Sequence, residues 1–185
     1  MRFIDAVRVF LGFWLAALIF TFPILVGWLF PIQKRRLIFY TPWLLFSKGV
    51  CLIFRIKLDV EGLENLKPGF EKNHLFICNH QSALDIPLLV SQYPIPFLTK
   101  KQNLIIPFLG LAGVLAGSIA FDRDKMGERR RVLREIVERV KEHTSLYIFP
   151  EGTRSRNGEI QERIYPALLR IAWKSGIDVI PIALH

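Results

Sequence analysis

Two short motifs contain the side chains best suited to chemistry. The first follows an apolar run, Phe76 to Cys78, which ends at Asn79 and His80, with Asp85 five residues after the histidine. A neutral imidazole is a good proton acceptor, because histidine ordinarily titrates near about pH 6.5. A carboxylate that accepts the other ring N–H fixes the tautomer and stabilises the imidazolium ion. We therefore predict that His80 is a general base and that Asp85 orients it.

A contact between His80 and Asp85 requires a particular local structure. On a regular helix, positions five apart diverge by roughly 140° around the axis, so two helical side chains at this spacing would not meet. The pair can meet if His80 lies in the loop after a buried strand and Asp85 lies in the first turn of a helix. We predict this arrangement, with a short helix from Asp85 to Ser91.

The second motif follows another apolar run, Ser145 to Phe149, and consists of Pro150, Glu151, Gly152, Thr153, Arg154 and Ser155. Backbone N–H groups in such a loop can converge on an anion, and glycine permits close approach. Arg154 adds a planar guanidinium group suited to phosphate. Glu151 would repel a phosphate unless it positions Arg154 or a substrate hydroxyl. The motif thus predicts an anion site in which the role of Glu151 is open.

Together and in this order, the two motifs resemble the signature of the glycerolipid acyltransferases, most closely the bacterial 1-acyl-glycerol-3-phosphate acyltransferase family. The likeness runs from Phe76 to His185. It implies a membrane-bound enzyme at the bacterial inner membrane, with its active site on the cytoplasmic face. The enzyme would move a fatty acyl group from acyl-CoA or acyl carrier protein to lysophosphatidic acid, giving phosphatidic acid, without a cofactor.

The resemblance also implies a substrate site around the catalytic residues His80 and Asp85. The residues expected at the glycerol-phosphate end are Arg123, Glu151, Gly152, Thr153, Arg154 and Lys100. Many members have a Phe-Lys-x-Gly stretch where this chain has Ile164 to Leu168, so the acceptor stays open. Glycerol-3-phosphate, a lysophospholipid and an amino-lipid are the alternatives to lysophosphatidic acid.

Two rival functions belong to other classes. Ser82 lies two residues after His80 and could be the nucleophile of a membrane-surface hydrolase, although no Gly-x-Ser-x-Gly elbow surrounds it. A non-catalytic membrane protein could bind phospholipid through the Arg154 loop. Direct attack by the substrate hydroxyl, with no acylated serine, is the preferred mechanism.

The composition favours a lipid surface as a partner. Hydrophobic residues make up 51% of the chain and the mean hydropathy is +0.31, both high for a soluble domain. Residues 1–59 hold eight basic and two acidic side chains, whereas residues 60–185 hold seventeen and fourteen. Basic residues beside apolar helices favour anionic membrane lipids over nucleic acid. Cys51 and Cys78 fit no metal-binding spacing, so we predict no structural metal.

The N-terminal part resembles a membrane anchor. Val9 to Gln33 contains no charged residue and is long enough to cross a bilayer as a helix. Pro31 and the basic cluster Lys34 to Arg36 are expected to end it, and a second apolar stretch follows from Leu37 to Phe54. Either both segments cross, or they form a hairpin in one leaflet. We prefer the hairpin, because Lys48 would cost ~3 kcal/mol at the bilayer centre and little in a shallow helix.

The remaining chain alternates strands with helices, which predicts an α/β fold. We expect a mixed central sheet flanked by helices, preceded by a two-helix membrane anchor, with domains at 1–58 and 59–185. Family members usually continue beyond the position of His185, so either the chain is short or its catalytic domain is incomplete. The expected elements are strands at 56–60, 76–78, 97–99, 119–121, 145–149 and 179–184, and helices at 125–143 and 165–175.

Overall fold

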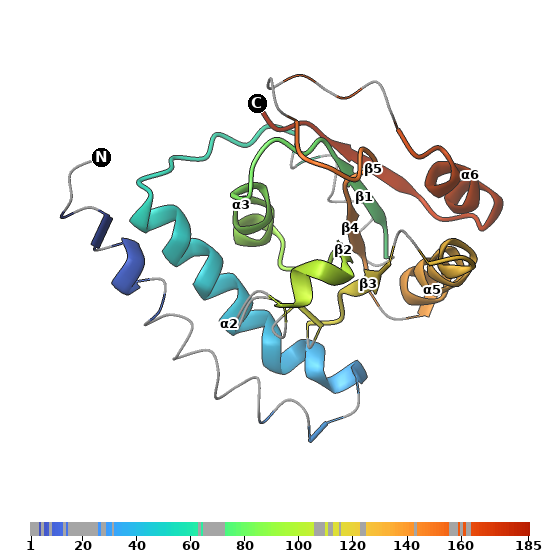
Figure 1. The fold of residues 1–185 in the computed structure, drawn as a ribbon, viewed down its shortest axis with the longest axis horizontal. Coiled ribbons are helices and arrows are strands. Elements are labelled where there is room, and N and C mark those ends of the chain that lie inside the picture. The colour runs from blue at the N-terminus through green and yellow to red at the C-terminus, as the bar shows by residue number, and fades with distance from the viewer. Residues whose placement is uncertain are drawn as a thin grey trace. The chain divides into compact units, whose positions relative to one another are not determined.

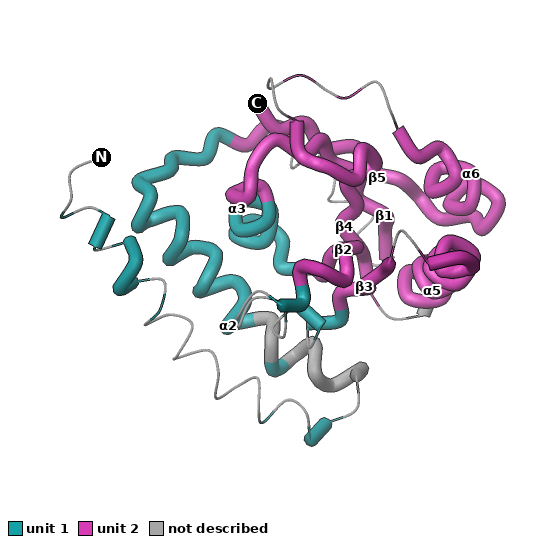
Figure 2. The backbone as a smooth tube through the Cα atoms, in the orientation of Figure 1, with its two compact units in different colours: residues 1–59, 86–94, 104–117 teal, residues 60–85, 95–103, 118–185 magenta. Residues whose placement is uncertain are grey.

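The computed structural model of the chain describes residues 4, 6–7, 9–12, 14, 26, 29–30, 32–62, 64, 73–105, 110, 113–114, 116–122, 125–142, 144–155, 159, 161 and 164–185. The chain divides into two compact units (Figure 2). Unit 1 comprises residues 1–59, 86–94 and 104–117, and unit 2 comprises residues 60–85, 95–103 and 118–185.

The main element of unit 1 is α2 (Ile32–Ile53), a helix of 22 residues with Pro42 inside it. α2 begins one residue after Pro31, which we expected to end the first helix together with the basic cluster Lys34 to Arg36. The cluster lies in the first turns of α2, because lysine and arginine are good helix formers. The first apolar segment, Val9 to Gln33, lies mostly outside the described residues. Within the described part of the chain, no helix is both long and apolar enough to span a membrane.

Unit 2 is built on parallel strands. β1 (Leu75–Cys78) lies between β4 (Leu146–Ile148) and β5 (Val179–Ile182), and Phe76 is paired with Tyr147 and with Ile180. β2 (Leu98–Lys100) pairs with β3 (Ile119–Phe121). A parallel bridge between Phe97 and Tyr147 links the two sheets.

Every strand pairing among the described residues is parallel, so the expected mixed sheet was wrong. The reason lies in the connections, which contain a helix or a long segment instead of a tight hairpin. The connecting elements are α3 (Asp85–Gln92), the short 3₁₀ helix η2 (Lys101–Ile105), α5 (Glu128–Glu142) and α6 (Ala167–Lys174). α5 and α6 lie on one face of the sheet (Figure 1), which confirms a sheet flanked by helices. Since the strands run the same way, the loops that follow them gather at one edge.

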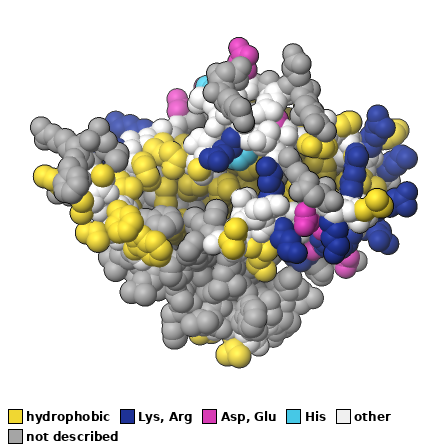
Figure 3. All heavy atoms as spheres, in the orientation of Figure 1, with side chains coloured by type: hydrophobic (Ala, Val, Ile, Leu, Met, Phe, Trp, Pro, Cys, Tyr) yellow, Lys and Arg dark blue, Asp and Glu magenta, His cyan; other side chains and the backbone are white. Residues whose placement is uncertain are grey.

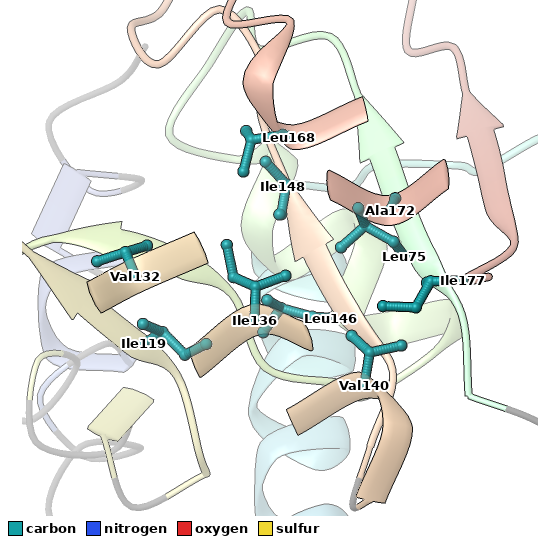
Figure 4. Close-up of a cluster of buried hydrophobic side chains, with 10 residues drawn as sticks. All are labelled: Leu75, Ile119, Val132, Ile136, Val140, Leu146, Ile148, Leu168, Ala172 and Ile177. Carbon is teal, nitrogen blue, oxygen red and sulfur yellow. The ribbon is translucent and has the colours of Figure 1, made fainter. Parts of the chain in front are cut away.

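The core of unit 2 fills the space between this sheet and α5 and α6 (Figure 4). α5 turns an apolar stripe toward this core, in which Ile136 and Val140 are 1% and 2% exposed. They pack with residues of the sheet and of α6, among them Leu75, Leu146 and Ala172. This packing fixes the strands whose ends hold the two motifs.

The opposite face of α5 is charged (Figure 3 shows basic side chains gathered where α5 and α6 lie). Arg131 bonds Glu128, Glu135 and the carbonyl of Ala120, which ties the start of α5 to the end of β3. The arginine hydrogen bond also lowers the pKa of Glu128 to about 2.

One expected strand is absent. Residues 56–60 form no strand, and four of these five side chains are exposed. Alternation alone does not make a strand when no neighbouring strand completes the hydrogen bonds.

Candidate active site

His80 and Asp85 are in contact, as the sequence predicted. β1 ends at Cys78, His80 lies in the following loop, and Asp85 is the first residue of α3. His80 Nδ1 lies 2.7 Å from Asp85 Oδ2. With Nδ1 protonated and donating to Asp85, the other ring nitrogen, Nε2, is the one that can accept a proton. The side chain of His80 is 15% exposed, so most of it is buried and a small part reaches solvent.

The carboxylate of Asp85 is fixed by hydrogen bonds from the loop that precedes it. Its Oδ2 atom also accepts the backbone N–H groups of Gln81, at 2.7 Å, and Ser82, at 2.9 Å. Burial alone would raise the pKa of Asp85, but the hydrogen bonds from His80 and the two backbone groups together lower it below its ordinary value. These hydrogen bonds therefore favour the ionised form of Asp85.

Ser82 takes part in the same turn. Its hydroxyl accepts the N–H of Leu84 at 3.0 Å, while its own N–H donates to Asp85. These contacts give Ser82 a structural task at the start of α3, and they do not support a role as nucleophile.

The second motif reaches His80 from the neighbouring strand. β4 ends at Ile148, and Glu151 comes three residues later with only 3% of its surface exposed. Glu151 Oε1 accepts the backbone N–H of His80 at 3.0 Å, and Oε2 accepts that of Gln161 at 3.3 Å. The N–H of Ser155 donates to the carbonyl of His80 at 2.7 Å.

Two backbone N–H groups of this loop have acceptors within the protein. The N–H of Gly152 donates to the carbonyl of Phe149 at 3.0 Å, and that of Ser155 donates to the carbonyl of His80. Gly152 has a φ of 67°, which favours glycine at this position of the turn. The turn leaves Thr153 and Arg154 exposed. Arg154 is thus the residue of this loop that presents a charge to solvent beside His80.

The remaining predicted residues are placed less fully. Lys100 is the last residue of β2, so it lies at the same edge of the sheet as the ends of β1 and β4. Arg123 lies outside the described residues. The structure therefore brings together His80, Asp85 and the Glu151 to Arg154 loop, and it puts Lys100 at the same edge.

Two contacts were missed by the reasoning from sequence. The ring of His80 stacks on that of Phe149, with centroids 4.0 Å apart and planes 17° from parallel. The side chain of Asn79 donates to the carbonyl of Leu184 and accepts its N–H, both at 2.7 Å. Phe149 and Asn79 sit at the ends of two apolar runs, and that position was the available signal.

Cys78 is the last residue of β1, directly before the loop that contains His80, and is 2% exposed. Burial, with the charges of Asp85 and Glu151, raises the pKa of its thiol to about 12. The thiol is therefore protonated and a poor nucleophile. Within the described residues, no group of His, Cys, Asp and Glu side chains could hold a metal ion.

Comparison with known proteins identifies relatives of this chain. The family model described as Acyltransferase matches residues 57–185. The chain is 36% identical to the chloroplastic 1-acyl-sn-glycerol-3-phosphate acyltransferase BAT2 of Brassica napus, over 69% of this chain and 37% of the relative. It is 32% identical to a lyso-ornithine lipid O-acyltransferase of Pseudomonas aeruginosa, over 83% of this chain and 55% of the relative.

A solved structure is similar over nearly all of the chain. It is PlsC, the 1-acyl-sn-glycerophosphate (LPA) acyltransferase of Thermotoga maritima, with a TM-score of 0.74 and 26% identity, covering 98% of this chain and 75% of PlsC. The chain spans between 36% and 55% of the length of five of its curated relatives. The match of the family model over residues 57–185 shows that the chain belongs to the acyltransferase family.

Proposed function

We propose that the protein is a 1-acyl-sn-glycerol-3-phosphate O-acyltransferase, which transfers a fatty acyl group from acyl-CoA or acyl carrier protein to lysophosphatidic acid. The contact of 2.7 Å between His80 and Asp85, at the sheet edge that also carries Arg154, is the observation that supports it most. The names of several relatives, including a protein from Borreliella burgdorferi, describe the same reaction.

In the proposed reaction, the free hydroxyl of the acceptor gives its proton to His80 Nε2 as its oxygen attacks the carbonyl carbon of the thioester. Asp85 stabilises the imidazolium ion that forms. The tetrahedral intermediate collapses, the C–S bond breaks, and the imidazolium returns the proton to the leaving thiolate. The products are phosphatidic acid and a free thiol, so no covalent acyl-enzyme is needed.

Arg154 is the proposed partner of the acceptor's phosphate. Arg154 is exposed, and the N–H of the next residue, Ser155, donates to the carbonyl of His80. The backbone that carries the guanidinium group is therefore fixed to the backbone of the proposed base. The side chain of Gln161 donates to the carbonyl of Arg154 at 2.9 Å, which further fixes the loop. A guanidinium fork can bind phosphate in a bidentate manner.

A lyso-ornithine lipid is a second candidate acceptor. The Pseudomonas relative with that acceptor in its name covers 83% of this chain, a larger share than the relative from Brassica napus does. The two candidates differ in chemistry, because a lyso-ornithine lipid carries no phosphate ester.

The test is acyl transfer by the purified protein, with both donors and a panel of lyso-acceptors, followed by thiol release and lipid product. We expect transfer to lysophosphatidic acid, and we expect His80→Ala to abolish it while the variant stays folded. Arg154→Ala should raise KM for lysophosphatidic acid by about tenfold to a hundredfold, because a hydrogen bond to a charged group contributes about 1.5–3 kcal/mol. Equal activity of His80→Ala and the wild type would refute the proposal, and transfer only to the lyso-ornithine lipid would favour the second candidate.

The proposal includes a membrane anchor in residues 1–58, formed as a hairpin in one leaflet, and a catalytic domain in residues 59–185. Large apolar side chains of unit 1 support it, since Leu45 and Leu52 on α2 are 57% and 80% exposed. Lys48, on the same helix, is exposed as well.

Binding to vesicles that contain phosphatidylglycerol tests this part. Leu45→Asp with Leu52→Asp should weaken co-sedimentation of the protein with the vesicles. Met126→Asp, at a side chain of unit 2 that is 99% exposed, is the control and should leave it unchanged. If the double variant binds as well as the wild type, this helix face is not the anchor.

A further inference from the structure

We infer that Glu151 is a positioning residue for His80, and that it makes no contact with the substrate. The resemblance placed it with the substrate-binding residues, but its side chain is 3% exposed, whereas Thr153 and Arg154 in the same loop are exposed. The inference rests on the proposed acyl transfer and assigns a task to one residue of that site.

Both oxygens of Glu151 are committed to backbone groups. Oε1 accepts the N–H of His80 at 3.0 Å and Oε2 accepts the N–H of Gln161 at 3.3 Å. A carboxylate suits two facing donors because it is acceptor-only, whereas an amide would turn its own NH₂ group toward one of them. A phosphate or an acceptor hydroxyl would have to displace one of these bonds to reach Glu151.

The peptide groups of His80 are held on both sides by the second motif. Glu151 accepts the N–H of His80, and the N–H of Ser155 donates to its carbonyl at 2.7 Å. The ring of Phe149 stacks on the imidazole at 4.0 Å. Three residues of one loop therefore fix the backbone and the ring plane of a histidine that lies 71 positions away from Glu151 in the sequence.

These contacts matter because His80 can act as the base only when its Nε2 atom points at the acceptor hydroxyl while its Nδ1 atom stays hydrogen-bonded to Asp85. A shift of the His80 backbone would move both nitrogens at once. Small misplacements of reacting groups can cost about a hundredfold in rate. Glu151 thereby couples the two motifs mechanically, while Arg154 faces the substrate.

The kinetic test compares Glu151→Ala, Glu151→Gln and Arg154→Ala with the wild type. Glu151→Ala should lower kcat by up to about a hundredfold and leave KM for lysophosphatidic acid within about twofold. Glu151→Gln keeps one acceptor oxygen for the His80 N–H, so it should restore part of kcat. Arg154→Ala should show the opposite pattern, with a raised KM. Glu138→Gln, the same change at an exposed carboxylate of α5, should match the wild type. A raised KM with unchanged kcat in the Glu151 variants would overturn the inference.

A second measurement does not depend on activity. Amide hydrogen exchange at His80 should be faster in Glu151→Ala than in the wild type, while the amide of Leu75, bonded to the carbonyl of Asp178, should exchange at the same rate in both. Unchanged exchange at His80 would overturn the inference even if catalysis fell. If the wild type transfers no acyl group to any acceptor, the proposed function fails, and the exchange experiment still decides whether Glu151 holds His80.

Discussion

The Nδ1 atom of His80 lies 2.7 Å from Oδ2 of Asp85, and the same oxygen accepts two backbone N–H groups from the loop between them. The carboxylate is therefore oriented by its own turn as well as by the histidine. Because the N–H donors of Gln81 and Ser82 persist whatever the state of the ring, Asp85 offers the imidazole a fixed partner.

Asp85→Asn should lower kcat of acyl transfer by about 10³- to 10⁴-fold, because an amide can turn its NH₂ group toward Nδ1 and favour the wrong tautomer. The measurement is thiol release from acyl-CoA with lysophosphatidic acid as acceptor. Asp178→Asn, at an exposed position before β5, is the control for the chemical change. Loss of less than about tenfold would show that Asp85 does not orient the base.

The stability of the protein should depend on the ionisation of Asp85 at low pH. Its pKa in the folded state lies below the ordinary value of 3.8, so the unfolded chain binds a proton first as pH falls. The stabilisation is fully present above the ordinary pKa and is lost as pH falls through the folded pKa.

Urea unfolding of the wild type and Asp85→Asn across this range measures the effect. The difference in unfolding free energy should be constant above about pH 5 and should shrink as the pH drops below the ordinary pKa. A difference that does not change with pH would contradict the prediction.

Cys78 should resist alkylation in the folded protein. Its pKa of about 12 leaves almost no thiolate at mildly alkaline pH, and only 2% of its surface is exposed. A Cys51→Ala variant leaves this thiol alone for peptide-level mass spectrometry with iodoacetamide. We expect little labelling under native conditions and complete labelling in urea. Rapid labelling of the folded variant would show that the loop after β1 opens.

Ile136→Ala should destabilise unit 2 by about 2–5 kcal/mol, because it leaves a cavity in a well-packed core. The side chain is 1% exposed and belongs to the cluster between α5 and the sheet. Arg134→Ala, on the exposed face of the same helix, should change the unfolding free energy by less than about 0.5 kcal/mol. Chemical unfolding followed by circular dichroism measures the unfolding free energy of both variants. Equal losses in the two would show that Ile136 is not part of the core.

Much of the local structure was predictable from sequence. The strand at Ile119 to Phe121, the short helix from Asp85 and the buried stripe of α5 follow from apolar runs and helical spacing, which are local properties. The contact between His80 and Asp85 was also predictable. A histidine in the loop and a carboxylate in the first helical turn, five residues apart, can adopt few arrangements in which their side chains do not meet.

The direction and neighbours of the strands were not predictable, because pairing depends on segments far apart in the sequence. The mixed sheet was a wrong expectation for this reason, and so was the strand at residues 56–60, which pairs with no strand in the part of the chain that the structure describes. A local sequence pattern does not determine which strand will pair with the segment that carries it.

The sequence alone determined the chemical groups: a histidine and a carboxylate at a spacing that permits contact, and a glycine-arginine loop after a second apolar run. Only the tertiary structure decided that the second loop lies against the first, because β1 and β4 are parallel neighbours whose ends meet at one edge. That adjacency turns Glu151 inward to the backbone of His80 and leaves Arg154 outside, a division that no spacing along the chain contains.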